Sequence, residues 1–122
     1  MCYFEANDFS EELIISKTKR ALSSIECFDI VLNGGEKWKN GTFVLKINQD
    51  QCIHQLQEEL SKIFKGVIKR PHLTIARNLP LQFLNNLILD DFQYYGNFAC
   101  ESITLLKRNA DEPYQIVEKI GL

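Results

Sequence analysis

The chain has 122 residues, of which 45% are hydrophobic and 25% are charged. These values are typical of a globular protein with one domain and one core. The formal net charge is −2 and the pI is about 5.7, which excludes a protein that coats nucleic acid through bulk charge. The sequence contains no apolar run of transmembrane length and no charged-then-apolar signal at its start. We therefore expect a cytoplasmic protein without a membrane contact.

The cysteine pattern argues against a metal centre. The four cysteines lie far apart, none forms a C-x-x-C pair, and the chain has only two histidines. The cysteines are Cys2, Cys27, Cys52 and Cys100. Zinc sites need closely spaced cysteine and histidine ligands, so we expect neither a metal nor another cofactor. Reduced, mostly buried thiols are the expected state.

Two segments have the spacing of amphipathic helices. Apolar residues recur at helical intervals over roughly residues 10–25, and Asp8 or Ser10 is placed to cap the start. A second helix is predicted after Asp50, which is a good N-cap residue. His54 lies on the polar side of this second helix, beside glutamine, glutamate and serine, so we expect a solvated histidine there.

A hairpin with a long loop is predicted between these helices. Cys27–Leu32 is β-prone, Asn33-Gly34-Gly35 breaks it, and Asn40-Gly41 turns the chain into a second strand, Thr42–Ile47. Trp38 would then lie in the loop, between two lysines. It either stacks on a nucleobase, as an indole among cations can, or folds back onto the edge of the sheet.

The segment Pro71-His72-Leu73-Thr74-Ile75-Ala76-Arg77 carries the clearest chemical signal. Side chains two residues apart in a strand leave the same face, so His72 and Thr74 share a face while Leu73 and Ile75 are expected to face the core. An imidazole exchanges protons near neutral pH, and a nearby hydroxyl can donate to an anionic oxygen. His72 and Thr74 are therefore the candidate catalytic residues.

Positive charge is concentrated around this strand. Between Leu60 and Leu89 the chain has no acidic residue but five cationic ones, which are Lys62, Lys65, Lys69, Arg70 and Arg77. A local positive field suits a phosphate-bearing ligand, and the planar arginine donors match phosphate oxygens. The candidate substrate-binding residues are Arg77, Arg70, Lys69 and Trp38. The alternative is an ordinary strand whose histidine is hydrogen-bonded at a sheet end, with lysines that solvate a helix.

The last third of the chain predicts one more helix and a terminal hairpin. Leu81–Leu89 is apolar enough for a short helix, and Asp90–Gly96 has the composition of a loop. A strand is expected over Asn97–Leu106, followed by a polar turn and a returning strand, Tyr114–Ile120. The predicted class is α+β, with a mixed, largely antiparallel sheet and two or three helices.

The order of these segments resembles the 2H phosphoesterase superfamily, the fold of RNA 2′,5′-ligase-like proteins and cyclic nucleotide phosphodiesterases. The segments that carry the resemblance are Phe28–Leu32, Phe43–Ile47, His72–Arg77, Ile103–Arg108 and Tyr114–Val117, and it covers most of residues 3–122. The resemblance implies two pseudo-symmetric lobes, each with a His-x-Thr or His-x-Ser strand. Without metal, one histidine would act as base and the other as acid on a 2′,3′-cyclic phosphate or 2′,5′ phosphodiester of RNA or nucleotides.

The chain departs from this pattern at its start. The first histidine motif would precede Cys2, and the opening strand and first helix of the family are absent. We therefore expect a single domain over residues 1–122 with an incomplete first lobe, in which only His72 and Thr74 match the catalytic motif. Phosphodiesterase or RNA ligase-like activity should accordingly be low. The alternatives are a non-catalytic module that binds nucleotides or RNA ends, and a structural remnant that recruits a partner.

The absent opening strand also bears on assembly. Without it, neighbouring strands such as Phe28–Leu32 would expose unpaired backbone groups along an edge. Pairing with a second copy would cover such an edge, and two-fold dimers are the commonest symmetric assembly. A homodimer is therefore expected.

Overall fold

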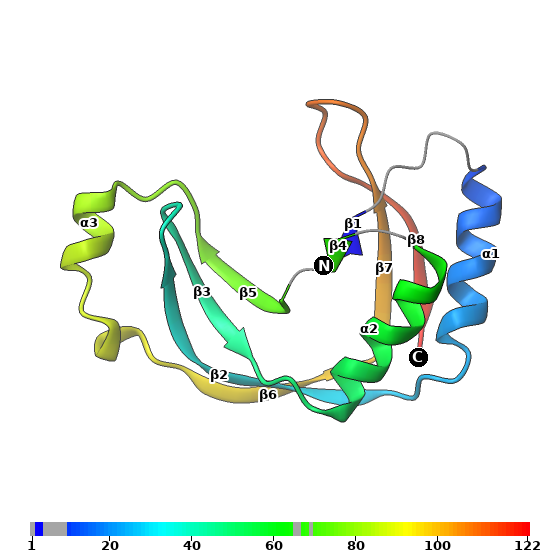
Figure 1. Ribbon diagram of the computed structural model, residues 1–122, viewed down its shortest axis with the longest axis horizontal. Coiled ribbons are helices and arrows are strands. Elements are labelled where there is room, and N and C mark those ends of the chain that lie inside the picture. Colours follow the sequence, from blue (N-terminus) through cyan, green and yellow to red (C-terminus); the bar gives the residue numbers. More distant parts are fainter. Residues whose placement is uncertain (1, 4–9, 65–66, 69) are drawn as a thin grey trace. The chain divides into compact units, whose positions relative to one another are not determined.

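A computed structural model describes residues 2–3, 10–64, 67–68 and 70–122 of the chain (Figure 1). The chain divides into two compact units. Unit 1 comprises residues 1–28, 50–69 and 99–122, and unit 2 comprises residues 29–49 and 70–98. The helices and the antiparallel strand pairs of the two units confirm the predicted α+β class.

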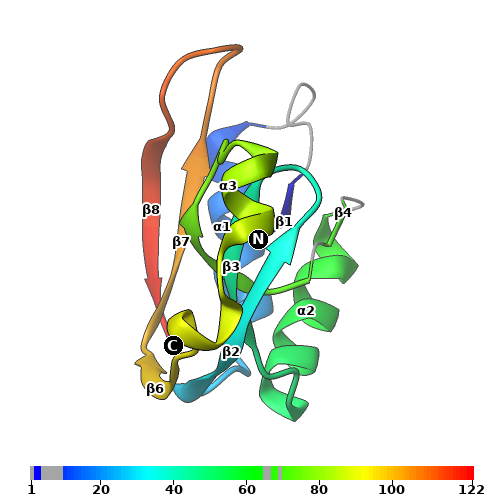
Figure 2. The same cartoon turned by 90° about the vertical axis from the view of Figure 1, so that its left-hand side faces the viewer.

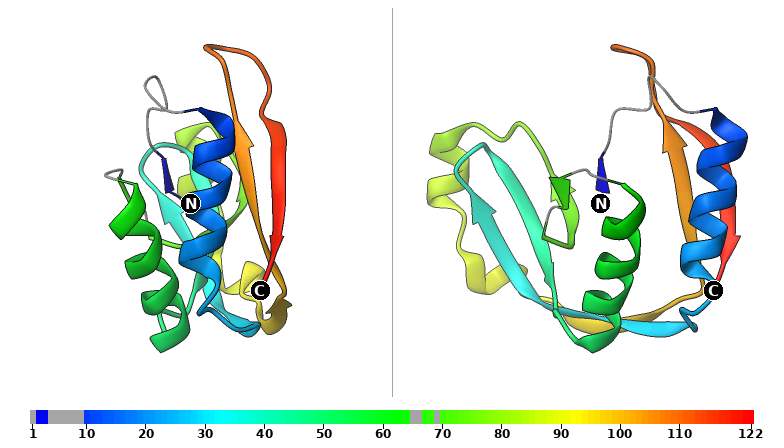
Figure 3. Two further views of the ribbon diagram at one scale, coloured as in Figure 1. Left: turned by 90° about the vertical axis from the view of Figure 1, so that its right-hand side faces the viewer. Right: turned by 45° about the vertical axis from the view of Figure 1, so that its right-hand side comes forward.

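Unit 1 contains two helices and two short antiparallel strand pairs (Figure 3). The helices are α1 (Glu11–Leu22) and α2 (Gln51–Ile63); the strand pairs are β1 (Cys2–Tyr3) with β4 (Val67–Ile68), and β7 (Ser102–Lys107) with β8 (Gln115–Gly121). Its core is centred on Leu22, Ile25 and Ile120, against which Leu56 and Ile103 pack. Both long helices therefore contribute their apolar side to one core with the terminal hairpin.

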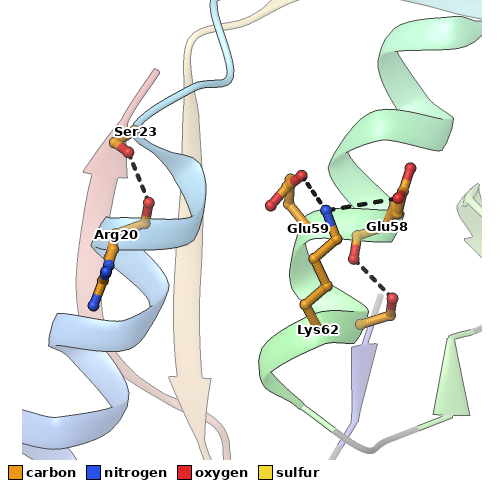
Figure 4. A network of polar contacts seen from close by, with 6 residues as sticks. Arg20, Ser23, Glu58, Glu59 and Lys62 are labelled. Carbon is orange, nitrogen blue, oxygen red and sulfur yellow. Dashed lines mark hydrogen bonds and ion pairs between the residues drawn. The ribbon is translucent and has the colours of Figure 1, made fainter.

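Local side-chain bonds define the ends of both long helices. The Ser10 hydroxyl accepts a hydrogen bond from the Leu13 amide, and the Asp50 carboxylate accepts one from the Ile53 amide at 3.0 Å. Ser10 and Asp50 are thus the predicted N-caps, while Asp8 lies outside the described residues. At the other end of α1, the Ser23 hydroxyl donates to the Arg20 carbonyl (Figure 4).

An ion-pair network lies on the exposed side of α2 (Figure 4). The Lys62 ammonium lies 2.7 Å from a Glu59 carboxylate oxygen and 3.6 Å from one of Glu58. The hydrogen bond to Glu59 raises the pKa of Lys62 above its ordinary value. Because these groups are solvated, the network orients side chains without adding much stability.

Unit 2 is built on a sheet with the strand order β5-β3-β2-β6, whose strands are labelled in Figure 1. The strands are β2 (Phe28–Trp38), β3 (Thr42–Ile47), β5 (His72–Ala76) and β6 (Tyr95–Cys100), and the β2–β3 and β3–β5 pairings are antiparallel. Two short helices follow β5, namely α3 (Leu81–Asn86) and a 3-10 turn, η1 (Leu89–Phe92). The predicted helix over Leu81–Leu89 is therefore present in shortened form.

The glycine pair after Leu32 does not end the strand, so the predicted long loop is wrong. β2 continues to Trp38 through a bulge between Leu32 and Gly35. Gly34 has a φ of 74°, and the Gly35 amide donates to the Gln93 side chain at 2.9 Å. A Cβ on Gly35 would lie 2.8 Å from the Phe43 ring. The glycines are thus needed for a bulge and a close approach, and the hairpin turn itself is the predicted Asn40-Gly41.

Two further predictions about strands are corrected. The strand predicted over Asn97–Leu106 is two strands, β6 and β7, which belong to different sheets and are separated at Glu101. The Glu101 carbonyl accepts a hydrogen bond from the Leu122 amide instead of continuing the ladder of β6. The strand predicted as an exposed edge, Phe28–Leu32, is the first part of β2, which lies between β3 and β6. The edge strands of this sheet are β5 and β6.

The segment after β5 covers one face of the unit 2 sheet (Figure 2). Phe92 makes an edge-to-face contact with Phe43 at 6.1 Å between ring centroids, and the Lys37 ammonium donates to the Leu87 carbonyl. Leu84 is buried with 3% of its surface exposed. We call this the covered face; it bears the odd-numbered positions Gly35 and Lys37 of β2 and Phe43 of β3.

The described cysteines differ in burial. Cys100 is buried, but Cys27 and Cys52 are exposed free thiols, so the expectation of mostly buried cysteines is wrong for these two. Among the helices in the described part of the chain, none has the length and apolar content to cross a membrane.

Candidate phosphate-binding site

The opposite face of the unit 2 sheet bears His72 and Thr74. In the antiparallel register, His72 pairs with Lys46 and Thr74 with Val44, and Val44 in turn pairs with Glu36. Directly paired residues of an antiparallel ladder point to the same face. We call this the histidine face; it bears Glu36, Trp38, Thr42, Val44, Lys46, His72 and Thr74.

Main-chain geometry sets the tautomer of His72. The Nδ1 atom lies 2.8 Å from the Arg70 carbonyl oxygen. A carbonyl can only accept a hydrogen bond, so Nδ1 must carry the hydrogen that it donates. In the neutral imidazole, Nε2 then has the free lone pair and can accept a proton. The half-buried ring is thereby held with its basic nitrogen available.

Trp38 and Arg70 contact His72 on this face. The indole and imidazole rings meet edge to face with centroids 4.5 Å apart. The Arg70 guanidinium carbon lies 5.9 Å from the centre of the indole ring, a cation–π distance. Trp38 is therefore part of a strand and of the histidine cluster, and neither predicted loop position applies to it. Residues at the end of β2 and before β5 meet because β3 brings the two strands to its opposite sides.

Two charged residues that the sequence did not single out belong to the histidine face. Glu36 forms an ion pair with the Arg70 guanidinium, and Lys46 lies opposite His72 in the register. Lys46 lies two residues after Val44 in one strand, so strand alternation could have predicted that the two share a face. Glu36 could not have been found in this way, because its segment has the composition of a loop and its partner is 34 residues away.

The remaining candidate residues lie elsewhere. Arg77 follows β5 and is five residues from His72, about 16 Å along an extended strand. It is exposed and, among the described residues, it forms no ion pair. Lys69 lies outside the described residues. Of the three predicted cationic ligands, Arg70 is thus the one that contacts the histidine cluster.

The apolar side chains of β5 are more exposed than predicted. Leu73 and Ile75 are 42% and 53% exposed, whereas His72 and Thr74 are more buried than either. The expectation that Leu73 and Ile75 face the core is therefore wrong. The segment that covers this side of the sheet contacts Gly35, Lys37 and Phe43 on the inner strands. β5 is an edge strand, and its apolar side extends beyond that cover.

A hydroxyl and two cations on one face can hold an anion beside the imidazole. Within the described part of the chain, the Thr74 hydroxyl makes no hydrogen bond. It can donate to a ligand oxygen while Arg70 and Lys46 supply positive charge.

A separate open pocket of about 390 Å³ lies in the same unit. It is lined by Val31, Asn33, Asn48, Tyr95 and Asn97, among others, and none of the predicted site residues lines it. His54, the other histidine, is exposed on α2 as predicted.

Comparison with known proteins indicates the family to which the chain belongs. A search of curated protein sequences finds no match to the chain. The sequence profile described as the 2′-5′ RNA ligase superfamily matches residues 1–112, which is most of the chain and includes every strand and helix before β8. The protein belongs to the 2′-5′ RNA ligase superfamily.

Proposed function

We propose that the histidine face of unit 2 binds the phosphate of an RNA end or nucleotide, as a 2′,3′-cyclic phosphate or a 2′,5′ phosphodiester. Family membership supports the ligand class. The observation that carries the proposal is the hydrogen bond between His72 Nδ1 and the Arg70 carbonyl, which leaves Nε2 free on the face that also bears Thr74. A phosphate there would meet one proton acceptor, His72 Nε2. It would also meet three hydrogen-bond donors, which are the Thr74 hydroxyl, the Arg70 guanidinium and the Lys46 ammonium.

In this arrangement, His72 exchanges a proton with an ester or water oxygen, and Thr74, Arg70 and Lys46 hold the phosphate oxygens. Charge on a transferring phosphoryl group is stabilised by such fixed donors. The Trp38 ring holds the imidazole plane by its edge contact. All of these residues belong to unit 2.

Turnover should be slow in this chain. Acid–base chemistry at a phosphodiester needs one group to remove a proton and another to supply one, and each contributes about 10²–10⁴ in rate. The chain has one His-x-Thr sequence, since His54 is followed by Gln55 and Leu56. A single His-x-Thr sequence therefore favours a binding module with weak activity over an efficient enzyme.

The test is a nucleotide titration followed by an assay for hydrolysis. Adding adenosine 2′,3′-cyclic phosphate to ¹⁵N-labelled protein should shift the resonances of His72, Thr74 and Lys46. His72→Ala should weaken the affinity at least several-fold, whereas the matched control His54→Ala should not. Shifts confined to other regions, or equal affinity in both variants, would overturn the proposed site. Rapid hydrolysis that survives His72→Ala would contradict the proposed role of this histidine.

A further inference from the structure

The cation that contacts the histidine cluster is already paired with a carboxylate. Arg70 forms its ion pair with Glu36, and the two side chains are 49% and 35% exposed. The guanidinium also lies over Trp38, and the Arg70 carbonyl binds His72. An anion that binds beside His72 therefore approaches an arginine whose charge is partly neutralised.

Among the residues that the structure describes, the charged groups on or against this face sum to one positive charge. Arg70 and Lys46 are cationic and Glu36 is anionic, while Lys37 lies on the covered face with its ammonium bound to the Leu87 carbonyl. A phosphodiester or a cyclic phosphate carries a single negative charge. A terminal phosphate monoester carries about 1.5 to 2 negative charges near neutral pH. The face thus matches the charge of a diester and not that of a monoester.

We propose that Glu36 makes the histidine face selective for singly charged phosphate esters over phosphate monoesters. It does so by occupying Arg70 and by repelling the second negative charge of a monoester. This inference rests on the proposed function and specifies which phosphate the site retains. Because hydrolysis of a cyclic phosphate produces a monoester, the same carboxylate would also favour release of the product.

The pair is better explained by ligand selection than by stability. A solvated ion pair contributes little to folding, and Glu36 lies on an inner strand whose backbone bonds are kept by glutamine. Glu36→Gln should therefore fold normally. Unit 1 offers a matched control in the pair between Lys19 and Glu118, whose carboxylate side chain is 33% exposed. Glu118→Gln changes the net charge by the same amount at a distant position in the sequence.

The experiment compares two ligands in three proteins. Dissociation constants are measured for adenosine 2′,3′-cyclic phosphate and adenosine 3′-monophosphate with the native chain, Glu36→Gln and Glu118→Gln, at about pH 8, where the monoester is a dianion. Glu36→Gln should strengthen monophosphate binding on the order of tenfold and cyclic phosphate binding about threefold, because the monoester has the extra charge. Glu118→Gln should change neither, and high salt should reduce the difference.

The possible results separate the selectivity by Glu36 from the proposed ligand. If the native chain binds the cyclic phosphate but Glu36→Gln leaves the ratio of the two affinities unchanged, the selectivity is overturned and the proposed function stands. If the native chain binds neither ligand but Glu36→Gln binds the monophosphate, exclusion by Glu36 stands and the proposed ligand is wrong. If no variant binds either ligand, both inferences are overturned.

Discussion

At the scale of single residues, His72 depends on the main chain more than on its side-chain neighbours. Its Nδ1 bonds to the carbonyl of Arg70, which any residue at position 70 supplies. The Arg70 side chain makes different contacts, to Glu36 and Trp38. The orientation of the imidazole and the positive charge beside it can therefore be separated by mutation.

Arg70→Gln should weaken phosphate binding without changing the tautomer of His72. The substitution removes the guanidinium but leaves the carbonyl that accepts from Nδ1. Long-range ¹H–¹⁵N spectra of neutral His72 should show hydrogen on Nδ1 in both proteins, while affinity for the cyclic phosphate falls on the order of fivefold to tenfold with loss of a charge-assisted bond. Hydrogen on Nε2 in the native chain would contradict the hydrogen bond from Nδ1 to the Arg70 carbonyl.

The cysteines should differ in reactivity according to burial. Burial raises the pKa of the Cys100 thiol. Since the thiolate is the reactive form, Cys100 has less of it at neutral pH and should be alkylated more slowly than the exposed Cys52. Peptide mass spectrometry after limited iodoacetamide treatment measures the rates. Raising the pH should speed labelling of Cys100, and urea should remove its protection; equal rates in the native protein would refute the prediction.

At the scale of elements, the β2–β3 hairpin determines which residues meet His72. Its turn places Gly41 with a φ of 79° against the Leu79 main chain, whose amide donates to the Gly41 carbonyl at 2.9 Å. The hairpin is thereby tied to the segment that follows β5. Trp38, at the end of β2, accepts a hydrogen bond from the Gly41 amide, so its position relative to His72 depends on the same geometry.

Gly41→Ala should destabilise the protein and disturb this cluster. A Cβ at position 41 would lie 2.6 Å from the Leu79 carbonyl oxygen, and the positive φ adds backbone strain. We expect a loss of about 1–3 kcal/mol in the free energy of unfolding. Gly121→Ala is the control, because a Cβ there meets nothing within 4 Å. Urea denaturation measures both; equal midpoints would show that the turn tolerates a side chain.

The N-cap of α2 offers a test that is independent of the site. Asp50→Ala removes the carboxylate that accepts from the Ile53 amide, and loss of such a cap costs about 1 kcal/mol. Asp50→Ser keeps an acceptor and should retain most of that stability. Thermal denaturation followed by circular dichroism compares the two variants. An alanine variant as stable as the serine variant would show that the cap contributes nothing.

At the scale of the whole molecule, assembly remains a prediction, but its structural basis has moved from β2 to β5. β2 is paired on both sides, whereas β5 is an edge strand with Leu73 and Ile75 exposed. An edge of this kind has free backbone groups and can pair with the same strand of a second copy around a two-fold axis. Such pairing would bury part of the exposed Leu73 and Ile75 side chains without rearranging the strands of either copy.

We therefore expect a homodimer at micromolar concentration that Ile75→Lys converts to monomer. A lysine on an edge strand opposes edge pairing, and Ile75 is already 53% exposed, so the folded monomer should tolerate it. Size-exclusion chromatography with light scattering gives the mass, against 14.1 kDa for one chain. Asn85→Lys, on an exposed position of α3, controls for the added charge. A native chain that elutes as a stable monomer would refute the dimer.

Short-range features of this protein were determined by its sequence alone. The N-caps Ser10 and Asp50, the turn at Asn40-Gly41 and the strand that carries His72 and Thr74 could all be predicted. Helix caps and turns form between residues three or four apart, and the side chains of a strand alternate between its two faces with a period of two residues. The order of such segments was also sufficient to indicate the superfamily.

The tertiary structure alone decided which segments pair and therefore which side chains meet. Gly34 and Gly35 form a bulge and not a loop because Phe43 on the paired strand and Gln93, which is distant in sequence, both approach closely there. β2 is an inner strand because β6 pairs with it, and Leu73 and Ile75 are exposed because β5 is not. Glu36 reaches Arg70 only through the register of three strands. Strand pairing joins residues far apart in the chain, and no local pattern encodes that choice of partner.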